Sequence, residues 1–96
     1  MRPSEALVAH RVELRQLVNR HDLKRPRVFG SVLTGMDTEE SDLDLLVEPA
    51  ETTTLLTIAG LQIDAEKLLG VPLPVMTPNG LPPKFRDMVL RQTRPL

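Results

Sequence analysis

Residues 28–31 read Val-Phe-Gly-Ser and residues 41–47 read Ser-Asp-Leu-Asp-Leu-Leu-Val, and these two stretches decide how the rest of the 96-residue sequence is interpreted. Each contains a short apolar run typical of a strand. Gly30 and Ser31 end the first strand in a turn that opens a brief helix, because glycine permits a tight turn and serine suits a helix N-cap. Asp42 and Asp44 stand two residues apart at the start of the second strand. Their carboxylates therefore project to the same face.

Working outward, helical spacing of apolar residues predicts a first helix over residues 4–19, with Ser4 as its N-cap. A second long helix is predicted from Thr52 or Thr53 to residue 69 and ends at Gly70, as helices commonly do at a glycine. Its predicted apolar face comprises Leu55, Ile58, Ala65 and Leu69. A last short helix begins at Pro82 and Pro83, because proline is tolerated in a first turn.

A third strand is predicted over residues 71–76. Pro72 and Pro74 lack N–H groups along one of its edges, so this strand is expected at the margin of the sheet. The predicted fold is thus α/β (α+β): one domain over residues 1–96, with a small mixed three-stranded sheet flanked by helices.

Composition restricts the function classes. Apolar residues make up 41% and charged residues 26% of the chain, as in ordinary globular domains. No apolar run has the roughly 20 residues that a membrane span needs, and there is no cysteine. The simplest expectation is a soluble cytoplasmic protein without a membrane association.

Charge is segregated along the chain. Residues 28–66 carry nine carboxylates and no Lys or Arg, whereas residues 1–27 and 67–96 each carry a net charge of +4. Phe29 and Phe85 are the only aromatic residues. Direct nucleic-acid binding is not favoured, because its usual signature is a basic excess with stacking aromatic side chains.

Two candidate sites follow from the opening stretches. Asp42 and Asp44 could bind Mg²⁺, which takes one or two carboxylates together with substrate phosphates, or they could simply be hydrated at a strand start. Gly30 and Ser31 lie where a strand gives way to a helix, a position suited to holding phosphate. A P-loop is excluded, because Met36 stands where that motif needs lysine.

Taken together, the Gly-Ser turn, the ten residues 32–41 and the Asp-x-Asp stretch are very similar to the signature of the polymerase-β-like nucleotidyltransferases. At this length the chain resembles the minimal nucleotidyltransferases. The resemblance covers nearly the whole chain, with its weight on residues 28–48. It implies a nucleotidyltransferase core in which Asp42 and Asp44 are catalytic and hold Mg²⁺, while Gly30 and Ser31 hold the triphosphate of ATP.

The same resemblance implies a prokaryotic antitoxin that transfers AMP from ATP to a HEPN-type toxin partner. Two departures from the family pattern leave an alternative open. Pro74 stands where the family usually has a third carboxylate, and Thr34 stands where many relatives have arginine. The alternative is a catalytically impaired binding module that neutralises its partner by contact. Whether the chain is an enzyme is therefore open at this point, with the enzyme slightly favoured.

Overall fold

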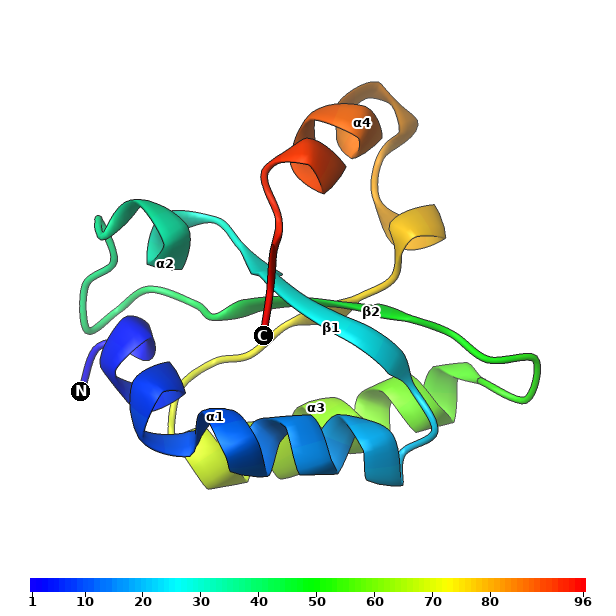
Figure 1. Cartoon of the computed structure of the whole chain (residues 1–96), viewed down its shortest axis with the longest axis horizontal. Helices are drawn as coiled ribbons and strands as arrows, with labels where there is room; N and C mark the ends of the chain where they lie inside the picture. Colours follow the sequence, from blue (N-terminus) through cyan, green and yellow to red (C-terminus); the bar gives the residue numbers. More distant parts are fainter.

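The computed structural model describes all residues, 1–96, and contains a mixed sheet with helices on both sides (Figure 1). The strands lie in the order β3-β2-β1-β4; β1 is antiparallel to both β2 and β4, and β2 is parallel to β3. The elements are α1 (Pro3–Arg20), β1 (Lys24–Phe29), α2 (Ser31–Thr34), β2 (Asp44–Glu48), α3 (Leu55–Leu69), β3 (Val75–Met76), the 3-10 turn η1 (Pro78–Gly80), α4 (Pro83–Arg91) and β4 (Arg94–Pro95).

The core lies between the sheet and the pair of helices α1 and α3, which pack side by side on one of its faces (Figure 1). Side chains of β2 point alternately to the two faces of the sheet. Leu45 and Val47 belong to the core cluster, whereas Asp44 and Leu46 lie on the other face. None of the helices combines the length and the hydropathy that crossing a membrane requires.

The predicted apolar face of α3 is only partly correct. Leu61, Ala65 and Leu69 are its buried residues, but Leu55 is 88% exposed. The helix begins at Leu55, with Thr54 rather than Thr52 or Thr53 as its N-cap. Gly70 ends the helix in the left-handed conformation, as predicted.

The sheet has four strands, so the prediction of three was wrong. The additional strand, β4, pairs with β1 through Arg27↔Pro95 and Val28↔Arg94. Two residues that include a proline show no strand periodicity, so this strand could not be predicted from the sequence. The pairing is held by tertiary contacts: the Leu96 N–H donates to the Pro26 carbonyl (3.0 Å), and Leu96 is buried.

The third strand does lie at the sheet margin, but for a different reason from the one predicted. The carbonyls of Pro72 and Pro74 accept from the N–H groups of Leu43 (2.8 Å) and Leu45 (3.0 Å), so the prolines face β2 rather than the outer edge. A proline nitrogen cannot return a ladder hydrogen bond, which limits β3 to two residues. On the outer edge, side chains of α3 accept from the strand: Glu66 from the Leu73 N–H and Gln62 from the Val75 N–H. These two contacts satisfy the N–H groups of Leu73 and Val75 on this edge.

Helix α1 begins one residue before the predicted range, with Arg2 rather than Ser4 as its N-cap. The Ser4 N–H instead donates to the carboxylate of Asp37 (2.9 Å), which comes from the loop after α2 and is buried. This hydrogen bond holds the pKa of Asp37 below its ordinary value, because it stabilises the ionised form. The loop between the two candidate sites is thereby tied to the first turn of α1.

Candidate functional site

The two stretches that carry the candidate residues meet at one end of the central strand pair. In the register of β1 and β2, Phe29 lies opposite Asp44, so the Gly30-Ser31 turn directly follows the residue paired with the aspartate. Gly30 has φ +85° and ψ −154°, a conformation open essentially to glycine alone. A Cβ atom at this position would lie 2.5 Å from Asp44 Oδ2. Glycine is therefore required both by its backbone angles and by the carboxylate beside it.

Asp44 is half-buried and Asp42 is exposed. Burial, and secondarily the negative charge of Asp42, raise the pKa of the Asp44 carboxyl above its ordinary value. Asp42 lies just before β2 begins, and its charge acts on Asp44, so a cation bound between the two carboxylates would stabilise them. The sequence prediction that both side chains project together is consistent with this interaction.

These two carboxylates suit one hard cation, whose other ligands would be water and phosphate oxygens. No group of three or more His, Cys, Asp or Glu side chains in the structure could hold a metal ion. Pro74 lies beside Asp44, because its carbonyl accepts from the N–H of Leu45 and the next residue, Val75, pairs with Leu45. The position where a third carboxylate was expected is thus adjacent to the pair and contributes no ligand.

The turn after Gly30 is closed by its own hydrogen bonds. The Leu33 N–H donates to the Gly30 carbonyl (3.1 Å), and the Thr34 hydroxyl donates to the Ser31 carbonyl (3.1 Å). Gly35 ends the single helical turn in the left-handed conformation. The Thr34 hydroxyl is therefore used within the turn, and the side chain has no positive charge with which to bind an anionic ligand.

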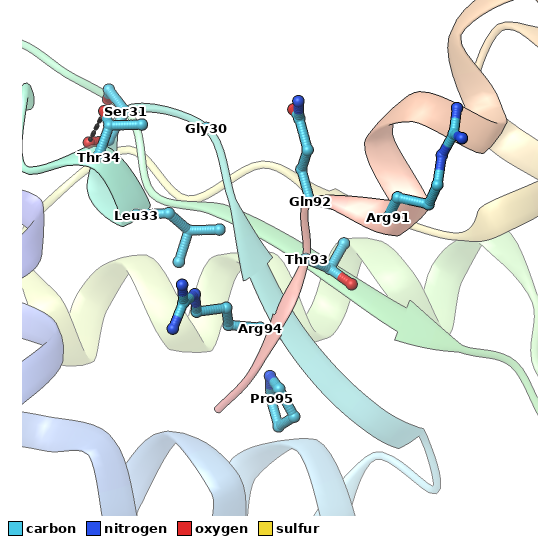
Figure 2. A pocket seen from close by; sticks show the side chains of 9 residues that line it. All are labelled: Gly30, Ser31, Leu33, Thr34, Arg91, Gln92, Thr93, Arg94 and Pro95. Carbon is cyan, nitrogen blue, oxygen red and sulfur yellow. Dashed lines mark hydrogen bonds between the residues drawn. The ribbon is translucent and has the colours of Figure 1, made fainter.

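A cavity of about 1020 Å³ adjoins this turn (Figure 2). One wall is α2 with Gly30 and Ser31, and the other is the C-terminal segment 91–95. Sequence reasoning missed this wall, because it depends on β4 bringing the C-terminal segment alongside β1. Gly30 joins the two parts of the site, since it lines the cavity and any Cβ at its position would meet the Asp44 carboxylate.

The histidines lie outside this arrangement, as expected for residues without ligand spacing. The Nε2 atom of His21 is 3.0 Å from the carboxylate of Asp64, which links the end of α1 to α3. His10 pairs with Glu13 on the same helix. Both contacts are structural.

Comparisons with known proteins agree with this geometry. Residues 9–96 match the nucleotidyltransferase domain family. The chain is 35% identical over 86 residues to the protein adenylyltransferase MntA of Thermococcus cleftensis, covering 90% of this chain and 84% of that protein. A solved structure described as a minimal nucleotidyltransferase is 46% identical, with a TM-score of 0.86, covering 97% of this chain and 95% of that one.

A crystal structure of a toxin–antitoxin with AMP-PNP has the same fold at 17% identity, with a TM-score of 0.72, covering 97% of this chain and 71% of that one. The fold class expected from the sequence is therefore confirmed. The family match spans most of the chain and includes both halves of the site. This chain belongs to the nucleotidyltransferase domain family and is similar to the MntA-type protein adenylyltransferases and minimal nucleotidyltransferases within it.

Proposed function

We propose that this protein is a Mg²⁺-dependent nucleotidyltransferase that transfers AMP from ATP to a hydroxyl group of a partner protein. The observation that supports the proposal is the close approach of the Gly30 turn to Asp44, which brings the two parts of the signature together at one end of β1 and β2. The similarity to MntA supports a protein acceptor. The toxin–antitoxin neighbour supports a toxin as that acceptor, and we propose one of the HEPN type.

The reaction joins the acceptor oxygen to the α-phosphorus of ATP and breaks the bond from that phosphorus to the bridging oxygen of the β-phosphate. Pyrophosphate leaves, and the acceptor hydroxyl gives its proton to bulk water. Asp42 and Asp44 would hold Mg²⁺, which supplies charge neutralisation at the reacting phosphate oxygens. Gly30 has no side chain that would displace the Asp44 carboxylate, and the Ser31 hydroxyl can donate to a phosphate oxygen.

Pro74 favours a second candidate, a binding module with weak or no catalysis. It lies next to Asp44 and can neither bind a metal nor accept the proton of the attacking hydroxyl. Under this alternative, the protein binds ATP through Asp42, Asp44 and the Gly30 turn but neutralises its partner by contact.

A label-transfer experiment separates these functions. The chain is purified together with its bound partner and incubated with Mg²⁺ and ATP labelled on the α-phosphate. Label on the partner, and none when the γ-phosphate is labelled instead, is the expected result. The matched control is the Asp42→Asn/Asp44→Asn variant, which should transfer nothing. Absence of transfer by a parent protein that still binds Mg-ATP would overturn catalysis and leave the contact mechanism.

A further inference from the structure

We infer that Asp37 is a positioning residue for the proposed metal site, because its buried carboxylate anchors the loop that carries Asp42. This inference rests on the proposed Mg²⁺-dependent function and adds to it a residue that binds neither metal nor nucleotide. The loop, residues 35–43, joins α2 to β2 and passes beside the first turn of α1 (Figure 1). Neither the turn at Gly30 nor the carboxylate pair explains why a charged side chain is buried in it.

The burial of Asp37 is unusual in this chain. Asp37 is 4% exposed and is the only polar or charged residue among the buried ones, whereas its neighbours in residues 34–36 and 38–40 are exposed. Burying an ionised carboxylate destabilises a fold unless hydrogen bonds compensate for the lost water. The Oδ2 atom accepts one hydrogen bond, but the buried Oδ1 atom has no partner. An apolar side chain would avoid this cost, so the carboxylate indicates a contact that packing alone does not provide.

The contact between Asp37 and α1 is directional. The Oδ2 atom accepts from the Ser4 N–H (2.9 Å), one of the N–H groups in a first helical turn that have no acceptor within the helix. A negative charge is also favourable at a helix N-terminus. Ala6 and Leu7 of the same helix belong to the hydrophobic core, so the anchor point is fixed to the body of the protein. Asp37 thus holds its loop at one place against α1.

Two hydrogen bonds link the residue after Asp37 to the residue before Asp42. The Ser41 N–H donates to the Thr38 carbonyl (3.0 Å), and the Thr38 N–H donates to the Ser41 hydroxyl (2.9 Å). On the other side of Asp42, Leu43 is fully buried. Asp42 is itself exposed, so these flanking anchors rather than its own packing determine where its carboxylate lies.

The test measures by calorimetry how much Mg²⁺ strengthens ATP binding, from titrations of each protein in Mg²⁺ and in EDTA. Asp37→Ala should reduce this Mg²⁺-dependent gain in affinity about tenfold, because a misplaced Asp42 weakens the metal site. Its affinity for ATP in EDTA should equal that of the parent. Asp37→Asn keeps an oxygen that can accept from the Ser4 N–H, so it should recover most of the gain. All titrations are made at a temperature at which thermal unfolding shows the variants to be folded.

Thr54→Ala is the matched control. It removes the hydroxyl that accepts from the Thr57 N–H in the first turn of α3, beyond the opposite end of β2, and so deletes the same kind of contact away from the site. Its Mg²⁺-dependent gain should equal that of the parent. Hydrogen exchange without metal gives a second readout: the Ser41 N–H should exchange faster in Asp37→Ala than in the parent or in Thr54→Ala.

The outcomes separate this inference from the proposed function. If Asp37→Ala keeps the full Mg²⁺-dependent gain, loses ATP affinity equally in EDTA, or loses no more of the gain than Thr54→Ala, the positioning role is wrong while the proposed function stands. If the gain falls as expected but the parent transfers no AMP, the positioning role stands and the proposed catalysis fails. A parent whose ATP binding does not respond to Mg²⁺ overturns the metal site and this inference with it.

Discussion

Replacing Gly30 with alanine tests the geometry that joins the two halves of the site. The variant must hold a Cβ atom at φ +85° and ψ −154°, which costs about 1–3 kcal/mol of folding free energy for a residue other than glycine. The added Cβ would also lie 2.5 Å from Asp44 Oδ2, so the carboxylate has to move. We therefore expect a loss of stability together with a displaced Asp44.

Gly70→Ala separates these two effects. Gly70 has φ +73°, and nothing lies within 4 Å of a Cβ built there, so this variant carries backbone strain without a displaced carboxylate. Its expected cost is about 1 kcal/mol, which corresponds to a decrease in Tm of about 4–8 °C for a domain of this size. Gly30→Ala should lower Tm at least as far.

The assay pairs thermal unfolding with calorimetric titration of Mg-ATP at a temperature where both variants are folded. Gly30→Ala should weaken Mg-ATP binding about tenfold or more, because the added Cβ disturbs both the Gly30-Ser31 turn and the Asp44 carboxylate. Gly70→Ala should bind as the parent does. Equal affinities for the folded Gly30→Ala and Gly70→Ala proteins would refute the reasoning, since the contact between Gly30 and Asp44 would then have no part in binding.

Three further predictions concern stability. The Ser4 N–H holds the pKa of Asp37 below its ordinary 3.8, so its stabilisation is present at neutral pH and is lost as pH falls below that value. Asp37→Asn should therefore lower stability at pH 7 and flatten the acid decline in urea titrations; an unchanged pH profile would contradict this. Leu14→Ala should lower the free energy of unfolding, measured in urea, by about 2–5 kcal/mol because the side chain is fully buried. The control Val12→Ala, at an exposed position, should change it by less than about 0.5 kcal/mol. Similar losses in the two variants would contradict the burial of Leu14. Thr54→Ala removes the N-cap of α3 and should lower the free energy of unfolding by about 1 kcal/mol in the same measurement. An unchanged free energy of unfolding would mean that the cap is not formed.

Local signals in the sequence predicted the parts of this fold that depend on neighbouring residues. Gly70 ends α3 because a left-handed residue is needed there, and glycine supplies it at little cost. The apolar run at residues 45–47 correctly predicted a strand there, and Leu45 and Val47 are buried in the core. Gly30 and Asp44 were assigned to one site only through the family resemblance, and the pairing of β1 with β2 is what brings them together.

Features that depend on distant parts of the chain could not be found in this way. Strand β4 exists because Leu96 is buried and its N–H finds the Pro26 carbonyl, and neither fact leaves a periodic pattern. Asp37 takes the place of the predicted Ser4 cap because a loop more than thirty residues away folds against α1. The cavity wall formed by residues 91–95 follows from β4, so it was missed along with that strand.

Calorimetric titration of Mg-ATP into the parent and into Asp42→Asn/Asp44→Asn tests the central claim most directly. The chain has no Trp or Tyr, which makes a label-free method preferable to intrinsic fluorescence. The account predicts binding that requires Mg²⁺ in the parent and is lost in the variant, whose folding is verified by its thermal unfolding. Equally tight binding by both proteins, or binding that is indifferent to Mg²⁺, would contradict the assignment of the two aspartates.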